Sequence, residues 1–141
     1  MIKKRVLTGL LVWLTAGSAL LFSRQQGTHF YDVDREVTIS GKVQEVIMEP
    51  RQPGSAPFLM VILKENSSGA VYKVEISPAW FFEQDLHQGE PLKITGSQVE
   101  SGEIKLIMAR RVQFRGEMKT VRDRHGFPNW SQGNRQRRRK R

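Results

Sequence analysis

The 141-residue sequence contains no cysteine. Disulfides, thiolate metal sites, c-type haem attachment, iron–sulfur ligation and a lipoprotein anchor are therefore excluded. Histidine is scarce as well: His29, His87 and His125 lie far apart, and no clustered carboxylates accompany them. Metal centres and nucleophilic active sites need such groups in recognisable arrangements. We therefore expect no catalytic residues, no metal site and no cofactor, and we predict that the protein is not an enzyme.

An excess of positive charge is found only at the two ends of the chain. The formal net charge is +9, but the two ends hold nine of the 23 basic residues, and the remaining 14 equal the acidic ones in number. Three of these nine are Lys3, Lys4 and Arg5. The other six form an electrostatic tail of Arg135, Arg137, Arg138, Arg139, Lys140 and Arg141. A basic pI that comes from the ends does not indicate a basic groove in the fold, and the tail predicts attachment to anionic lipid headgroups or an acidic partner protein.

The longest uncharged run extends from Val6 to Phe22 and follows the first basic residues. Residues 1–23 are therefore predicted to be either a cleaved signal peptide or an uncleaved signal anchor that forms a transmembrane helix. We favour the anchor, because apolar residues continue beyond the possible cleavage site at residues 17–19. In both cases the domain is exported to the bacterial periplasm, and an anchor would tether it to the inner membrane.

Beyond a polar linker at residues 24–35, strand patterns dominate the sequence. Alternating apolar and polar residues predict a strand over residues 36–48, in which Gly41 suits a bend and a phase slip after Val43 indicates a bulge or strong coiling. Further strands are predicted at residues 58–63, 71–76, 92–96 and 104–114, with tight turns at 66–69 and 100–103. A proline-rich loop at residues 49–57 separates the first two strands.

One short helix is expected between the third and fourth strands. Ser77 is predicted to cap the helix, Pro78 to occupy its first position and Gly89 to end it. Aromatic and aliphatic side chains of the helix would then plug one end of the sheet, namely Trp80, Phe81 and Leu86.

Five strands with the only helix between the third and the fourth is the element order of an OB-fold. We predict an all-β, five-stranded OB-fold-like barrel at residues 36–131, followed by a disordered Arg-rich tail at residues 132–141. An SH3-like barrel and an open sandwich are the alternatives, and the position of the helix favours the OB-fold. The segment 126–130 is predicted to fold back and place Trp130 on the barrel. Structural roles are expected for Gly41, Trp80, Gly89, Gly96 and Trp130.

Several stretches of this sequence match those of a known family. They are residues 41–43, 78–84, 89–97, 109–112 and 121–130. On these residues the chain resembles an uncharacterised family of small exported bacterial OB-fold proteins, over about residues 35 to 131. Residues 122–130 match the family's Arg-Asp-x-x-Gly-x-Pro-x-Trp signature, whereas the long 49–57 loop and the Arg-rich end depart from the family pattern. The resemblance implies a fold and a compartment, and it supplies no catalytic residues.

The candidate binding residues are basic and aromatic side chains near the second, third and fifth strands. They are Arg51, Phe58, Tyr72, Lys73, Arg110 and Arg111. Aromatic residues beside lysine and arginine on these strands are what single-stranded nucleic acid requires of an OB-fold. For Tyr72 and Phe58 the alternative is packing in the core. For the segment from Arg110 to Arg124 the alternative is a solvated, salt-bridged face.

These observations predict a non-catalytic, exported OB-fold binding module, an accessory or assembly factor of an envelope complex. The loops at residues 49–57 and 99–103 would form its recognition surface. One alternative is a single-stranded nucleic-acid-binding protein. Another is an accessory subunit of a metal or redox enzyme, for which His87 and His125 would be tested first.

Overall fold

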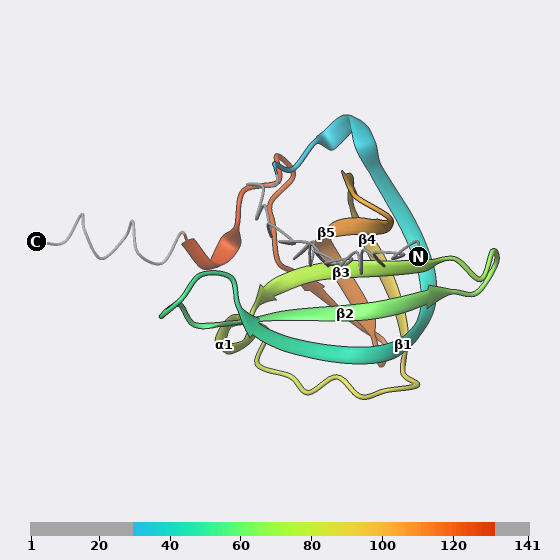
Figure 1. Cartoon of the computed structure of the whole chain (residues 1–141), viewed down its shortest axis with the longest axis horizontal. Coiled ribbons are helices and arrows are strands. Elements are labelled where there is room, and N and C mark those ends of the chain that lie inside the picture. The colour runs from blue at the N-terminus through green and yellow to red at the C-terminus, as the bar shows by residue number, and fades with distance from the viewer. Residues whose placement is uncertain (1–29, 132–141) are drawn as a thin grey trace, which may run out of the picture.

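The computed structural model describes residues 30–131 (Figure 1). The predicted signal or anchor, the first half of the predicted linker and the Arg-rich tail lie outside the described residues. Among the residues from 30 to 131, no helix has the length and apolar character needed to cross a membrane.

The described chain forms a closed β-barrel. Its elements are η1 (Val33–Arg35), β1 (Glu36–Pro50), β2 (Pro57–Glu65), β3 (Val71–Pro78), α1 (Ala79–Phe82), β4 (Pro91–Ser101), β5 (Ile104–Phe114) and β6 (Glu117–Thr120). Strand β1 pairs with both β2 and β4, and a parallel ladder between β3 and β5 closes the ring β1-β2-β3-β5-β4. This closed ring, with a helix between β3 and β4, confirms the predicted all-β barrel and its OB-fold order.

Strand β1 serves two partners because it is long and strongly bent. Its first half pairs with β4 and its second half with β2. The register shifts between Val43 and Glu45, which confirms the predicted bulge. A Cβ on Gly41 would collide with the backbone oxygen of Lys64, so only glycine fits where β2 crosses closest. Gly96 in β4 is under the same constraint, because a Cβ there would collide with the backbone oxygen of Met108.

The interior of the barrel is filled by one face of each strand. Its fully buried members include Val61, Leu63, Val74, Ile76, Ile94, Ile107 and Val112. Tyr72 also belongs to this core, which agrees with the packing alternative for that residue. The opposite faces carry the polar side chains discussed below together with buried apolar residues, which are Phe58 and Met60 of β2 and Leu106 and Met108 of β5.

The helix differs from its prediction. Residues 77 and 78 continue the ladder with β2, so α1 begins only at Ala79, and Pro78 stands at the N-cap without a side-chain hydrogen bond. The helix ends at Phe82, followed by the C-cap Glu83 with a left-handed φ of 59°, and not at Gly89. Trp80 and Phe82 are two residues apart and therefore point to opposite sides of a helix. Phe82 and Leu86 are buried, whereas Trp80 is 59% exposed, so the prediction that Trp80 plugs the barrel is wrong.

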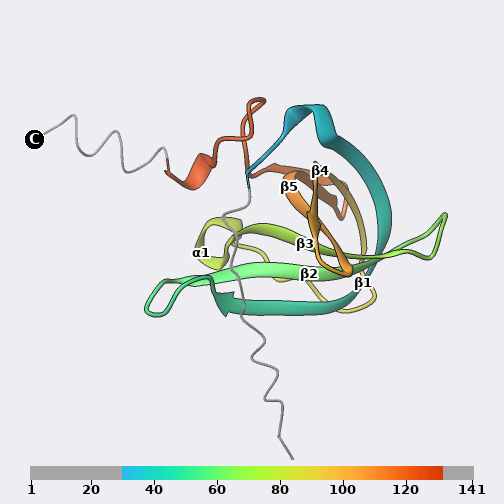
Figure 2. The ribbon, with the colours of Figure 1, turned by 45° about the horizontal axis from the view of Figure 1, so that its top comes forward.

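Beyond β5 the chain forms a sixth strand that the sequence pattern did not predict. A turn at Arg115 and Gly116, both with positive φ, leads into β6, which pairs with β5. Residues 121–131 then return along the barrel, as Figure 2 shows in red. Val121 and Arg122 are buried, and Trp130 packs against the core cluster. The predicted return of Trp130 is therefore confirmed.

Candidate functional site: an arginine–aromatic cluster and a polar network

Two charged groups lie where β3 and β5 meet. Arg51, from the loop between β1 and β2, forms an ion pair with Glu75 of β3. Its guanidinium also lies over the ring of Phe58, 4.0 Å from the ring centroid. Phe58 in turn contacts Trp130 edge-on, at 5.9 Å between ring centroids. The fold thus brings together two of the predicted binding residues, Arg51 and Phe58, and adds a carboxylate and an indole to them.

Arg122 lies buried beside this pair, with only 1% of its surface exposed. The β3–β5 ladder ends at Glu75 and Met108, so the carbonyl oxygens of the next residues have no ladder partner there. Arg122 donates to both of them, the oxygen of Ile76 at 3.3 Å and that of Ala109. Burial, followed by the charge of Arg51, lowers the pKa of Arg122 to about 10. Arg122 therefore links β3 and β5 where the ladder between them ends. We call this β3–β5 junction the seam of the barrel.

Aromatic rings continue this cluster to the surface. Trp130 lies 5.9 Å from Phe81, and Phe81 lies 6.0 Å from Trp80, measured between ring centroids. We call Trp80, Phe81, Trp130 and Phe58 the aromatic row. The ammonium of Lys119 is 5.1 Å from the ring centroid of Phe81, and Arg122 lies over Trp130 at 4.9 Å. The row therefore has cations along its length and an exposed tryptophan at its end.

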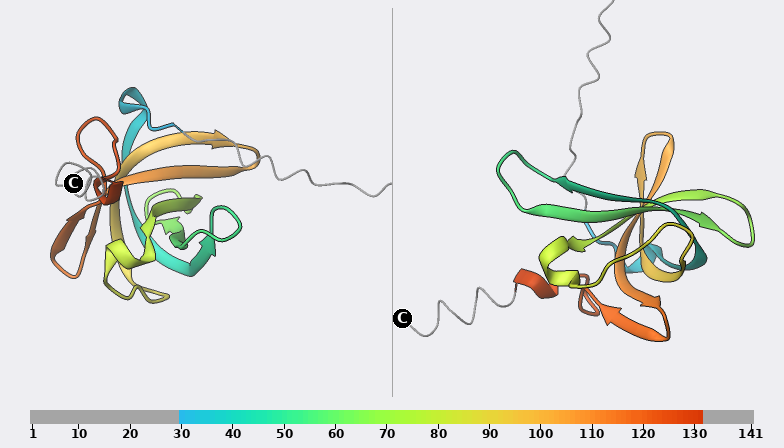
Figure 3. Two further views of the ribbon diagram at one scale, coloured as in Figure 1. Left: turned by 90° about the vertical axis from the view of Figure 1, so that its left-hand side faces the viewer. Right: turned by 90° about the horizontal axis from the view of Figure 1, so that it is seen from below.

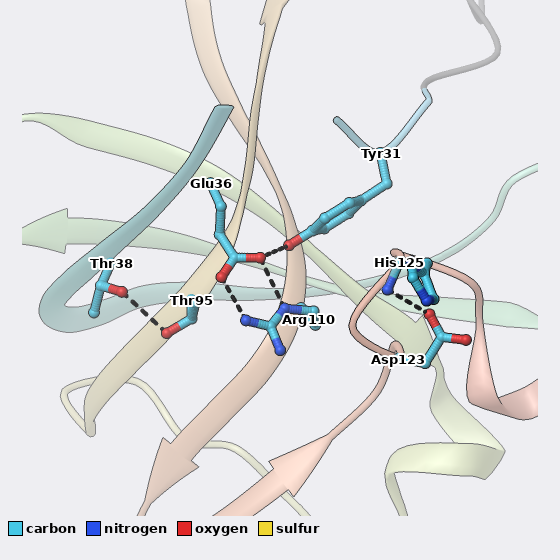
Figure 4. Close-up of polar contacts among 7 residues, drawn as sticks. All are labelled: Tyr31, Glu36, Thr38, Thr95, Arg110, Asp123 and His125. Atoms are coloured by element: carbon cyan, nitrogen blue, oxygen red, sulfur yellow. Dashed lines mark hydrogen bonds and ion pairs between the residues drawn. The ribbon is translucent and has the colours of Figure 1, made fainter. Parts of the chain in front are cut away.

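A second network joins the entry of the chain to β5 (Figure 4). Arg110 donates hydrogen bonds from two nitrogens to the carboxylate of Glu36, with Nε 2.8 Å from Oε2. The hydroxyl of Tyr31 donates to the same oxygen at 2.6 Å. The hydrogen bond from Arg110 lowers the pKa of Glu36, and burial with the bond to Glu36 raises the pKa of Tyr31 to about 12. Residue 31, in the predicted linker, is thus packed against the barrel.

The terminal signature is held together by local structure. Asp123 accepts hydrogen bonds from the backbone N–H groups of His125 at 2.8 Å (Figure 4) and Phe127 at 3.0 Å. Gly126 has a φ of +86°, and a Cβ there would collide with the ring of Tyr31. The Arg, Asp, Gly and Trp of the signature therefore each have a packing or hydrogen-bonding role. The histidine imidazole in this turn contacts Arg124.

The other predicted residues have different surroundings. The Tyr72 hydroxyl lies 3.4 Å from Glu65, and Lys73 lies half-buried on β3. Arg111 follows Arg110 on β5, beside the Glu36 network. Sequence reasoning missed four residues of these networks, which are Glu36, Glu75, Tyr31 and Arg122. Glu75, a carboxylate between Val74 and Ile76 in a predicted strand, is the signal that could have revealed one of them.

Two other predicted features can be compared with the fold. Within residues 30–131, no group of three or more histidine, aspartate or glutamate side chains could hold a metal ion. The β1–β2 loop and the β4–β5 hairpin both project beyond the barrel, in different directions in the right panel of Figure 3. These are the two loops that the sequence analysis selected as a recognition surface.

The structure defines a small OB-fold protein in which charged side chains lie over the junction between β3 and β5. A family model matches residues 35–119, and the chain belongs to this family, the MamS/MamX magnetosome protein family. No protein with a curated description matches the chain in sequence.

Solved structures with a similar course of the chain include two bacterial domains. One is the N-terminal domain of PriB protein from Thermoanaerobacter tencongensis, at 23% identity and a TM-score of 0.47, covering 60% of this chain and 99% of that chain. The other is the SSB domain of a protein from Synechococcus sp., at 14% identity and a TM-score of 0.48, covering 62% and 98%. The fold assignment rests on the strand order of this chain itself.

Proposed function

We propose that the protein is a non-catalytic, exported OB-fold binding module that serves as an accessory or assembly factor of a membrane complex of the magnetosome. Membership of a family described by that organelle supports the location. The proposal includes export to the periplasmic side, with residues 1–23 as signal or inner-membrane anchor. The partner is a protein of the same membrane complex, and the Arg-rich tail adds attachment to anionic lipid or to that partner.

The exposed end of the aromatic row is the observation that carries this proposal. Trp80 leaves 59% of its surface in solvent, although its ring packs against Phe81, which in turn packs against the indole of Trp130. Tryptophan and arginine are the residues most enriched at the energetic centres of protein interfaces. An exposed indole beside Phe81, over whose ring Lys119 lies, therefore fits a partner surface that offers an apolar pocket with a carboxylate beside it.

A pull-down from detergent-solubilised membranes tests the proposal. The baits are the full-length protein, a chain ending at Gln132, and the variants Trp80→Ala and Phe127→Ala. Phe127 is a matched control, because it is an exposed aromatic residue outside the aromatic row. We expect the wild-type chain and Phe127→Ala to recover one discrete set of membrane proteins, and Trp80→Ala to lose most of it. Equal recovery with Trp80→Ala would contradict the proposed surface.

Nucleic-acid binding is the second candidate. The alternation of cations and rings along the aromatic row is the observation that favours it, because single strands bind by stacking beside phosphate-neutralising charges. Under this hypothesis both the full-length chain and the chain ending at Gln132 would recover nucleic acid and no discrete protein set. Recovery with the full-length chain alone would place recognition on the Arg-rich tail.

A further inference from the structure

Arg111 stands out from the other arginines of the barrel. Its Nε atom is buried and has no hydrogen-bond partner among residues 30–131. The adjacent Arg110, by contrast, uses two nitrogens to hold Glu36. Buried donors of a charged group are almost always paired in folded proteins, and an orphan of this kind indicates a missing water or ion. The guanidinium of Arg111 is therefore a donor group whose acceptor has to come from outside the described chain.

Hydroxyl groups flank Arg111 on both neighbouring strands. In the strand register it lies directly opposite Thr95 of β4 and Thr120 of β6. Residues directly opposite each other in antiparallel strands share a face, with Cβ atoms about 4.5–5.5 Å apart. Thr38 of β1 extends the row, with its hydroxyl 3.1 Å from that of Thr95. A line of threonine hydroxyls thus crosses four strands with Arg111 inside it (Figure 4 shows Thr38 and Thr95).

The charged side chains around Arg111 carry a net positive charge. Glu36 is the carboxylate nearest in the network, and it is already engaged by Arg110 and Tyr31. The charge of Arg111 contributes to lowering the pKa of Glu36, so two guanidiniums share one carboxylate. Lys93 lies two residues before Thr95 on β4 and therefore on the same face of the sheet. An anion placed against Arg111 would meet donors and an excess of positive charge.

We propose that Arg111, together with Thr95, Thr120 and Lys93, binds a phosphate group on the outer face of β4, β5 and β6. Guanidinium and hydroxyl donors on three neighbouring strands suit an acceptor with several oxygens, and the arginine fork matches phosphate geometry. Arg111 is the central ligand, and binding would provide the acceptor that its buried Nε lacks. This site lies on other side chains than the aromatic row, so it does not depend on the proposed function.

The test is a titration of the full-length protein in detergent with inorganic phosphate, at constant ionic strength set by sodium chloride. Binding is followed by calorimetry and by the rise of the unfolding temperature, because a ligand of the folded state stabilises it. We expect Arg111→Gln to weaken phosphate affinity at least about tenfold, since a charge-assisted hydrogen bond is lost. Lys64→Gln removes the same charge from an exposed position on β2 and should leave the affinity unchanged.

Further arms keep the result decisive. Thr120→Val removes only a hydroxyl from an exposed strand position, so it tests the site even where Arg111→Gln folds poorly, and it should weaken binding several-fold. Glycerol 3-phosphate and glycerophosphoglycerol distinguish a free phosphate from a phosphodiester lipid headgroup: Arg111-dependent binding of either supports the site and names its source. Absence of binding for inorganic phosphate and for both glycerol compounds, or equal affinity in wild type and Arg111→Gln, would overturn the inference.

Discussion

The paired carboxylates of Glu36 and Glu75 contribute differently to stability from the ion pairs on the surface. Glu36 and Glu75 are largely buried, and each is held by an arginine from a distant part of the chain. Glu100 pairs with Arg35 as well, but both side chains are mostly exposed. Exposed pairs contribute little to stability, whereas a buried charge that loses its partner is costly. The contribution of a carboxylate to this fold therefore follows its burial.

Replacing Glu36 by glutamine should lower the free energy of unfolding at pH 7 by about 1–3 kcal/mol, because Arg110 and Tyr31 lose a charged acceptor. The pKa of Glu36 is lowered in the folded state, so its contribution is complete above the ordinary value of 4.5 and is lost as the pH falls through the folded-state pKa. The difference between wild type and Glu36→Gln should therefore shrink in acid.

Urea unfolding measured at a series of pH values checks this prediction. Glu100→Gln is the matched control, since the Glu100 side chain is 84% exposed and its loss should cost less than about 1 kcal/mol. A difference between wild type and Glu36→Gln that stayed constant from pH 7 into strong acid would show that the ion pair does not carry the effect.

At the scale of elements, the short helix α1 places one aromatic side chain in the core and another in solvent. Phe82 lies in the core, with its ring centroid 5.5 Å from that of Phe114. Trp80 points to solvent at the end of the aromatic row. The strand ladder that extends through Pro78 sets where the helix begins, and this start decides which aromatic residue faces inward.

The helix therefore predicts opposite outcomes for two aromatic substitutions. Phe82→Ala should destabilise the fold by about 3–5 kcal/mol, because it leaves a cavity in the core. Trp80→Ala should cost less than about 1 kcal/mol, since an exposed ring buries little area on folding. Chemical denaturation of the two variants checks this order. A larger loss for Trp80→Ala than for Phe82→Ala would mean that the helix turns its other face to the core.

At the scale of the whole molecule, the barrel is completed by the segments that precede β1 and follow β6. Val121, Arg122 and Trp130 cover the seam between β3 and β5, and Tyr31 packs against the turn at Gly126. The segments before β1 and after β6 thus lie together on one part of the barrel, as Figure 2 shows. The folding unit extends from Tyr31 to Trp130.

A chain that ends at Thr120 should consequently be much less stable than one that ends at Gln132. It loses the Arg122 hydrogen bonds to two carbonyl oxygens and the packing of Val121 and Trp130, for a total of at least about 3 kcal/mol. Thermal unfolding of the two chains tests this, with the full-length protein as reference. Equal unfolding temperatures would show that the return segment is dispensable for the barrel.

Local signals in the chain were enough to predict the first five strands, their order and the bulge in β1. Period-two alternation and turn residues are such signals, and a glycine such as Gly41 or Gly102 marks a close approach or a turn without knowledge of the rest of the fold. For the same reason the return of Trp130 could be predicted from its isolated aromatic signature. The family resemblance agreed with the OB-like barrel that the order of strands and helix had already indicated.

Which charges are buried, and what each of them touches, depends instead on how the barrel closes. Arg122 and Arg124 are two residues apart in a basic segment, yet the first is buried under carbonyl oxygens and the second is exposed. Glu36 meets Arg110 across 74 positions of sequence, a pairing that no local pattern encodes. The start of α1 was likewise set by pairing between β2 and β3. Hydrogen bonds and ion pairs between distant segments form only once the strands are in register. Neither the Arg122 contacts nor the Glu36–Arg110 pair could therefore be predicted from the sequence alone.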